Sequence, residues 1–227
     1  MGQINTIKNK IRLRVKAMIE YIGLYFWWVK SRNAENRILL ELSRSAAATI
    51  GVKPFKKIKI AYTEDVINAA AVGFLCRTLV ISQGMLNILT LDELQAVIFH
   101  EYAHCRRKHH LKLAASSLSV MFIEALPYLY IALNMESEAV FFTLTVVFFA
   151  LIYVSTLLFT RYLTRKFEEE ADITVVEMLE NPRIYLQVLQ KIAVRSSTGR
   201  MGLVERLFSS HPPPAERLRK LYTYLYY

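Results

Sequence analysis

The sequence predicts a mainly α-helical fold with a small β-sheet, interrupted by a transmembrane helical hairpin. Three observations support this prediction. The 227 residues are 54% hydrophobic with a mean hydropathy of +0.25, which is high for a soluble domain of this length. Two long apolar runs are joined by a short acidic segment. Alternating and amphipathic segments flank these runs and indicate a folded part outside the lipid.

Residues 4–22 predict a basic amphipathic helix at a membrane surface. Apolar side chains recur there at helical spacing, namely Ile4, Ile7, Ile11, Val15, Met18, Ile19 and Ile22. Lysines and arginines lie between them and an aromatic cluster over 25–28 follows, a pattern that favours anionic lipid. The apolar core at 17–29 is short for a span and contains Glu20, and no signal-peptide cleavage pattern follows. We therefore expect residues 1–30 to form a membrane-surface segment.

Residues 31–110 predict the first part of a folded domain. A helix is expected over 34–50. Polar and apolar side chains alternate over 56–62, as they do in a half-buried strand. Two further short strands are expected over 66–73 and 79–82, so that a small sheet precedes the next helix.

The pentapeptide HEYAH at residues 100–104 predicts a metal site. A capping box at 90–93 starts a helix that runs through it, so that His100 and His104 lie one turn apart on one face. Two such imidazoles can hold a single Zn²⁺, with Glu101 placed to act on its water. The alternative is a pair of solvated or pore-facing histidines. Because zinc hydrolases generally use three protein ligands, the metal interpretation requires a third ligand elsewhere.

Two apolar runs predict the transmembrane hairpin. Residues 139–160 contain no charged side chain and are long enough to cross a bilayer as a helix. Residues 113–133 carry only Glu124 and are expected to kink at Pro127, so a buried core helix is the alternative for this run. The acidic segment 134–138 joins the two.

We assign the transmembrane hairpin to residues 111–163. The charges beside it predict its orientation. Basic side chains flank both runs on the side of the folded parts, namely Arg106, Arg107, Lys108, Lys112, Arg161, Arg165 and Lys166. The connecting segment contains no lysine or arginine, so the positive-inside rule predicts a multi-pass protein of the cell membrane with its folded parts on the cytoplasmic side. That compartment is reducing, and we expect Cys76 and Cys105 to be free thiols. The net charge of +10 comes without a nucleic-acid recognition motif, so we expect no nucleic-acid partner.

Residues 164–227 predict the second part of the folded domain, with helices near 162–180, 182–194 and 214–226. Neither this part nor the segment before the hairpin has a sizeable core alone. The two parts are therefore expected to pack together.

Glu168 is the predicted third ligand. Glu168 and Asp172 share one helix face, and a carboxylate one turn beyond a ligand can accept the free N–H of a zinc-bound imidazole. If both apolar helices continue into the motifs, His104 and Glu168 stand roughly 14 Å and 12 Å from the ends of the runs, at similar heights above the bilayer. The alternative is a solvated acidic patch.

These motifs, in this order, resemble those of the HtpX-like membrane zinc metalloproteases, relatives of the CAAX prenyl endopeptidases. The resemblance extends over about residues 68–221. It is carried by Asn68-Ala69, by Leu91-Asp92-Glu93-Leu94 leading into HEYAH, by the hairpin, by Arg165-x-x-Glu168-x-x-Ala171-Asp172 and by Ser210-His211-Pro212-Pro213-x-x-Glu216-Arg217-Leu218. It implies a zincin-type metalloprotease domain interrupted by the hairpin.

The resemblance also implies roles for individual residues. One Zn²⁺ per chain would be bound by His100, His104 and Glu168. Glu101 would be the general base, and Asp172 the partner of a zinc-bound histidine. The residues expected to align a substrate strand are Asn68, Ala69, Ala70, Ala71 and Val72.

Two further residues match family positions near the site. His211 and Arg217 would stabilise the oxyanion or occupy the open position on the metal. A histidine in a proline-terminated loop and a surface arginine are the alternatives.

The function expected from these features is that of a membrane-anchored zinc endopeptidase acting on misfolded or membrane proteins. Its expected partners are polypeptide substrates and the lipid bilayer, and the oligomeric state is left open. Family members typically have two transmembrane helices before the catalytic helix, where this chain has the amphipathic segment over 4–29. The chain also lacks the length for a multi-helix chamber, so prenylated substrates are not implied. A non-catalytic zinc-binding scaffold and an intramembrane-type metalloprotease are the alternatives.

Overall fold

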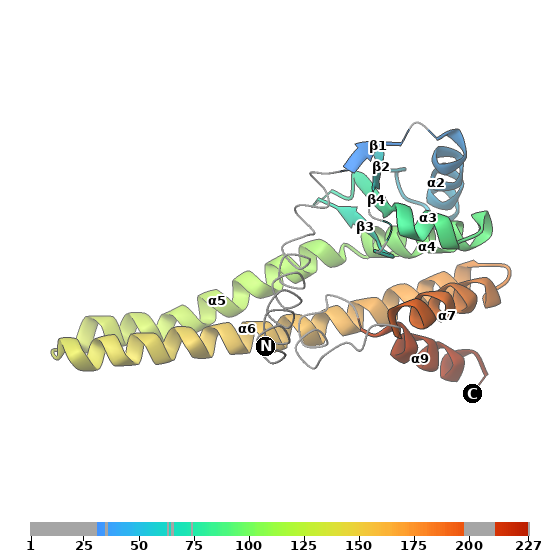
Figure 1. Cartoon of the computed structure of the whole chain (residues 1–227). Coiled ribbons are helices and arrows are strands. Elements are labelled where there is room, and N and C mark those ends of the chain that lie inside the picture. The colour runs from blue at the N-terminus through green and yellow to red at the C-terminus, as the bar shows by residue number, and fades with distance from the viewer. Residues whose placement is uncertain are drawn as a thin grey trace, which may run out of the picture.

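Two long helices form a hairpin that carries a mixed α/β lobe at one end (Figure 1). The computed structural model describes residues 31–34, 36–62, 64, 66–73, 75–197 and 212–226. The elements follow in the order β1 (Ser31–Asn33), α2 (Arg37–Ile50), β2 (Lys57–Ala61), β3 (Ala69–Val72), β4 (Thr78–Ser82), α3 (Gln83–Ile88), α4 (Leu91–Arg106), α5 (His109–Asn134), α6 (Glu138–Met178), α7 (Arg183–Ser197) and α9 (Pro214–Tyr226). The surface helix expected over 4–22 and His211 lie outside the described residues. The mainly helical fold with a small sheet is confirmed.

The sheet has four strands in the order β1-β2-β4-β3. β2 and β4 are parallel, whereas β1 and β3 are antiparallel edge strands. The three strands that the alternation predicts are confirmed, although β3 is shorter than expected. The three-residue β1 was not predicted, because so short a strand carries no periodicity.

The hydrogen bonds at the N-terminal end of β3 show which backbone groups of this strand face β4 and which face outward. The carbonyl of Asn68 accepts a hydrogen bond from the backbone N–H of Ser82, so the backbone of Asn68 faces β4. Since backbone groups alternate along an antiparallel strand, those of Ala69 and Ala71 point to the free edge. This edge lies beside α4.

The helix α2 forms because its ends are capped and one face is apolar. The side chain of Asn36 accepts from the N–H of Ile38 at 2.9 Å, and Gly51 ends the helix with a left-handed φ of 76°. The buried face, which includes Leu39 and Ala46, packs against α4.

The helix α4 is the buried centre of the lobe. The predicted capping box at Thr90 and Glu93 is present, and all five residues from His100 to His104 are buried. Tyr102, inside this segment, points away from the metal face. Its hydroxyl bonds to Ser43 Oγ at 2.7 Å and accepts from the N–H of Phe55 at 2.9 Å, while its ring stacks on that of Phe55. These contacts fix the rotation of α4 about its own axis.

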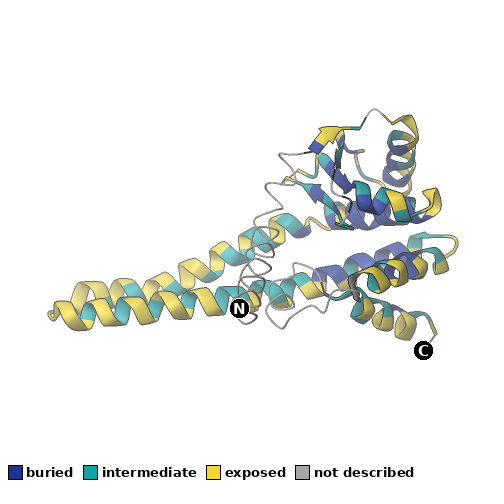
Figure 2. Cartoon of the chain, in the orientation of Figure 1, coloured by how far each residue is buried: buried dark blue, intermediate teal, exposed yellow. Residues whose placement is uncertain are grey.

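Both hairpin helices are long and apolar enough to cross a membrane. Their far ends expose most of their side chains, unlike the lobe (Figure 2). α6 has 41 residues, about 60 Å of unbroken helix, so the separate helix expected near 162–180 is the end of α6. Pro127 lies inside α5.

The two hairpin helices reach the lobe differently. α6 runs without a break from the apolar run to Glu168, as expected. α4 and α5, in contrast, are not one rod. Lys108 adopts a left-handed φ of 54° and the chain turns there, so the assumption of continuity was wrong on this side.

The prediction of two free thiols was also wrong. Cys76 and Cys105 form a disulfide, with their Cα atoms 5.7 Å apart. Cys76 lies in the turn between β3 and β4, which packs beside the C-terminal end of α4. A sequence separation of 29 residues gives no sign of this proximity, because it arises only from tertiary packing.

Reduction of this disulfide should destabilise the lobe. A crosslink closing a loop of 29 residues removes unfolded-state entropy equivalent to about 3.6 kcal/mol. The double variant Cys76→Ser/Cys105→Ser is therefore expected to melt at a lower temperature than the oxidised protein in detergent. Added reductant should lower the melting temperature of the wild-type protein and leave that of the variant unchanged. Equal melting of oxidised and reduced protein would contradict the prediction.

Candidate metal centre

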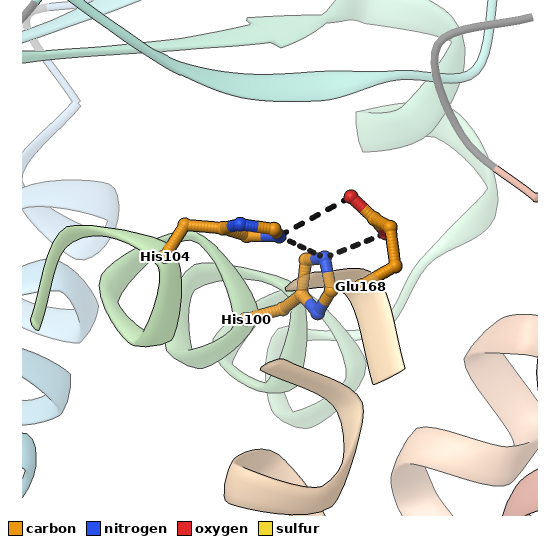
Figure 3. Close-up of side chains that lie close together, drawn as sticks. All are labelled: His100, His104 and Glu168. Carbon is orange, nitrogen blue, oxygen red and sulfur yellow. Dashed lines mark hydrogen bonds and ion pairs between the residues drawn. The ribbon is translucent and has the colours of Figure 1, made fainter. Parts of the chain in front are cut away.

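Three buried side chains converge between α4 and α6 (Figure 3). The Nε2 atoms of His100 and His104 are 3.1 Å apart. Glu168 Oε2 is 3.5 Å from His100 Nε2, and Glu168 Oε1 is 3.3 Å from His104 Nε2. One donor atom from each residue lies within 4.8 Å of the others. The solvated alternatives for the histidine pair and the acidic patch do not fit this burial, because Glu168 is only 2% exposed.

This donor set fits a tetrahedral zinc ion. With zinc–ligand bonds of about 2.1 Å, tetrahedral ligands are separated by about 3.4 Å. The two imidazole nitrogens are 3.1 Å apart, close to that value, and each has a different oxygen of Glu168 near it, at 3.5 Å for His100 and 3.3 Å for His104. Two imidazole nitrogens and one carboxylate leave a fourth position open.

His100 is held on its far side by Asp172 and Tyr185. Asp172 Oδ1 lies 3.2 Å from His100 Nδ1, and the Tyr185 hydroxyl lies 2.9 Å from the same nitrogen. The Tyr185 hydroxyl also donates to Asp172 Oδ1 at 2.7 Å. The sequence predicted Asp172 on this face, whereas Tyr185 on α7 was missed, because it is one of 13 tyrosines and adjoins no motif.

Neighbouring charges and hydrogen bonds shift the pKa values of Asp172 and His100. Burial by itself would raise the pKa of Asp172, but the charge of Arg217 and the hydrogen bonds to His100 and Arg217 hold that pKa well below its usual range. Burial and Arg217 lower the pKa of His100, yet hydrogen bonds to Asp172 and Glu168 raise it to about 9 overall. The carboxylates therefore attract a cation to this position.

Arg217 brings α9 into the site. Its Nε donates to Asp172 Oδ2 at 2.9 Å, and its Nη1 lies 3.3 Å from Glu168 Oε2. With its side chain 13% exposed and two carboxylates as partners, it is not a surface arginine. A pocket between α6 and α9, lined in part by Asp172 and Arg217, opens beside this pair.

Glu101 faces the sheet. Its Oε2 accepts a hydrogen bond of 2.7 Å from the backbone N–H of Ala71, one of the outward-facing groups of β3. Glu101 is buried, directly follows the candidate ligand His100 in the sequence, and contacts the edge strand β3 through this hydrogen bond. The predicted site residues that the structure describes thus lie on neighbouring elements. His100, Glu101 and His104 are on α4, Glu168 and Asp172 on α6, Arg217 on α9, and residues 68–72 at the adjacent edge of the sheet.

The second histidine also has a partner that sequence reasoning missed. His109 Nδ1 lies 3.0 Å from His104 Nδ1, and its Nε2 lies 3.3 Å from Glu170 Oε2. His109 gave no sequence signal, because a residue five positions after His104 would lie on another face of a continuous helix.

Comparison with known proteins identifies the family. The model of peptidase family M48 matches residues 33–225. The chain belongs to peptidase family M48. This M48 chain is 26% identical to protease HtpX of Histophilus somni over 213 residues, covering 84% of this chain and 73% of that protein. It is 29% identical to the protease HtpX homolog of Syntrophobacter fumaroxidans over 214 residues, covering 82% and 74%.

A solved structure shares the fold of this M48 chain. The crystal structure of S. mikatae Ste24p matches with a TM-score of 0.65 at 18% sequence identity. The match covers 93% of this chain but 56% of Ste24p, so it shows a common fold and nothing more about activity. Together with the HtpX relatives, it confirms the family resemblance that the motifs indicate.

Removing the Tyr185 hydroxyl should weaken the metal centre. Tyr185→Phe keeps the buried ring but removes a hydrogen bond to both Asp172 and His100, and loss of such an outer partner typically costs about 10–100-fold in metal affinity. Zinc affinity, measured by chelator competition, is expected to fall by at least about tenfold. The matched control Tyr222→Phe, at a half-exposed position on α9, should bind zinc as the wild type does. Equal affinities for both variants would refute the role of Tyr185.

Proposed function

We propose that this M48 protein is a membrane-anchored zinc endopeptidase. The observation that carries the proposal is the buried set of two imidazoles and one carboxylate with donor atoms within 4.8 Å of one another, next to a Glu101 that is hydrogen-bonded to the edge strand β3. This arrangement supplies a metal site, a proton acceptor and a place for an extended peptide. The HtpX proteases to which the chain is similar support it.

The residues divide the chemistry among them. His100, His104 and Glu168 would hold the ion, and Zn²⁺ supplies Lewis acidity toward a scissile carbonyl and its attacking water. Glu101 would take the proton of that water and later deliver it to the leaving amine. Arg217, already beside Glu168, would stabilise negative charge on the substrate oxygen, and we assign the same role to His211.

An extended substrate would add to the edge of β3. The backbone groups of Ala69 and Ala71 point away from β4, and a substrate strand would pair with them after the Ala71 N–H exchanges Glu101 for the peptide. The small alanine side chains favour a close approach. Asn68 and Val72 bound this segment, and Ala70 pairs with β4. Because the site lies at the lobe end of the apolar hairpin, we propose misfolded or membrane proteins as substrates.

The architecture supports a division into four parts. We propose a membrane-surface segment at 1–30, catalytic parts at 31–110 and 164–227, and a transmembrane hairpin at 111–163. α4 packs in the lobe against α2, α6 and α7, and the turn at Lys108 divides it from the hairpin helix α5. This placement favours an endopeptidase site outside the lipid over an intramembrane-type site.

Glu101→Gln is the decisive test of the enzyme proposal. The variant should bind zinc as the wild type does, because Glu101 is not among the three converging ligands. Its cleavage of casein in detergent should fall by at least about 10²–10⁴-fold, the typical contribution of a general base. A chelator should abolish wild-type cleavage, and added zinc should restore it.

The exposed variant Glu41→Gln on α2 provides the control and should cleave normally. Undiminished cleavage by Glu101→Gln would refute the mechanism. A wild-type protein that binds zinc but cleaves no peptide would instead favour the scaffold function.

We also propose that the lobe lies on the cytoplasmic side, on the basis of the charges beside the hairpin. On that side thiols are kept reduced, so the Cys76–Cys105 disulfide would form there only under oxidising conditions.

Cysteine labelling tests this orientation. In a Cys76→Ser/Cys105→Ser background, Glu136→Cys in the segment between α5 and α6 should react with a membrane-impermeant maleimide in intact cells. Lys53→Cys, exposed on the lobe, should react only after permeabilisation. The opposite labelling pattern would place the site on the outer side.

A further inference from the structure

His109 stands behind His104 as Asp172 stands behind His100. The Nδ1 atoms of His104 and His109 are 3.0 Å apart, and both residues are buried. We propose that His109 is a positioning residue for the metal centre: it accepts a hydrogen bond from His104 Nδ1–H and thereby directs His104 Nε2 to the ion. This inference rests on the proposed zinc site and adds a residue to it.

The hydrogen-bond directions are mutually consistent. A neutral imidazole that binds a metal through Nε2 carries its proton on Nδ1, so His104 must donate to His109 Nδ1. His109 then carries its own proton on Nε2, where Glu170 Oε2 lies 3.3 Å away as the acceptor. Glu170 in turn lies 3.4 Å from Arg107 Nη1. One chain of donors and acceptors thus runs from the ion to a carboxylate on α6.

The backbone turn between α4 and α5 makes this contact possible. Residues five apart on a continuous helix differ by about 140° around its axis, so His109 could not face His104 if α4 continued. The left-handed Lys108 breaks the helix and returns the chain to the same side. A lysine in this conformation costs about 1–2 kcal/mol, which the surrounding contacts must offset.

Packing is the competing explanation for a buried histidine here. The His109 ring stacks on Phe167, with centroids 4.4 Å apart and planes 7° from parallel. Phe167 directly precedes Glu168, so a merely structural ring would also influence the site. The two roles make opposite demands on a substitution, because packing needs the ring and positioning needs the acceptor atom.

Two variants separate these roles. His109→Phe keeps an aromatic ring against Phe167 but removes the acceptor, whereas His109→Asn loses the ring and keeps an acceptor oxygen near the position of Nδ1. For a positioning residue, the zinc affinity of the full-length protein in detergent should fall about 10–100-fold in His109→Phe and stay within about threefold in His109→Asn. The visible spectrum of the Co²⁺-loaded protein should change in the first variant and not in the second.

Further measurements keep the outcome decisive. Glu170→Leu removes the acceptor behind His109 and leaves the imidazole in place, and it should also weaken zinc binding. This variant replaces His109→Phe as the test if His109→Phe does not fold. Tyr222→Phe, the half-exposed control on α9 used above, should leave the affinity unchanged. Normal zinc affinity in His109→Phe and Glu170→Leu, or loss in His109→Asn alone, would overturn the positioning role while leaving the peptidase proposal intact. A wild-type protein that binds no zinc would overturn both.

Discussion

A buried carboxylate placed against two imidazoles and a guanidinium is the constraint on which the site depends. Glu168 is 2% exposed, and burial of an ionised carboxylate is costly unless it is paired. Its partners are His100 and His104 on α4 and Arg217 on α9. Glu168 on α6 therefore connects α4, which precedes the hairpin, to α9, which follows it. Removing any partner leaves charge uncompensated in the centre of the lobe.

The same principle applies to the shell around these residues. Asp172 connects Arg217, Tyr185 and His100, while Glu170 connects Arg107 and His109. Each imidazole of the candidate metal centre thus has its far nitrogen facing a side chain that is itself held by a partner. α6 supplies both carboxylates of this shell as well as Glu168. It also forms half of the hairpin, so the site is tied rigidly to the apolar segment.

The parts of the fold that depend on local pattern could be predicted from sequence. Periodicity indicated the strands and the apolar helices, and the capping box at Thr90 marked the start of α4. The spacing of Glu168 and Asp172 placed both on one helix face, where the structure has them. These features need only the geometry of a single element.

The features that sequence reasoning missed depend on packing between distant segments. Nothing local indicates that Tyr185 reaches His100, or that Cys76 lies beside Cys105. His109 was missed because its position depends on one left-handed residue, Lys108, which no propensity favours. Sequence also left the burial of Arg217 open, since that burial requires α9 to pack against α6.

The separation of the donors along the chain has a consequence for biosynthesis. The histidine pair is translated well before Glu168, and the whole hairpin lies between them. A nascent chain in which only α4 has been synthesised contains two of the three donors and lacks the carboxylate of Glu168. The three-donor set is complete only after the hairpin has been made and α6 lies against α4.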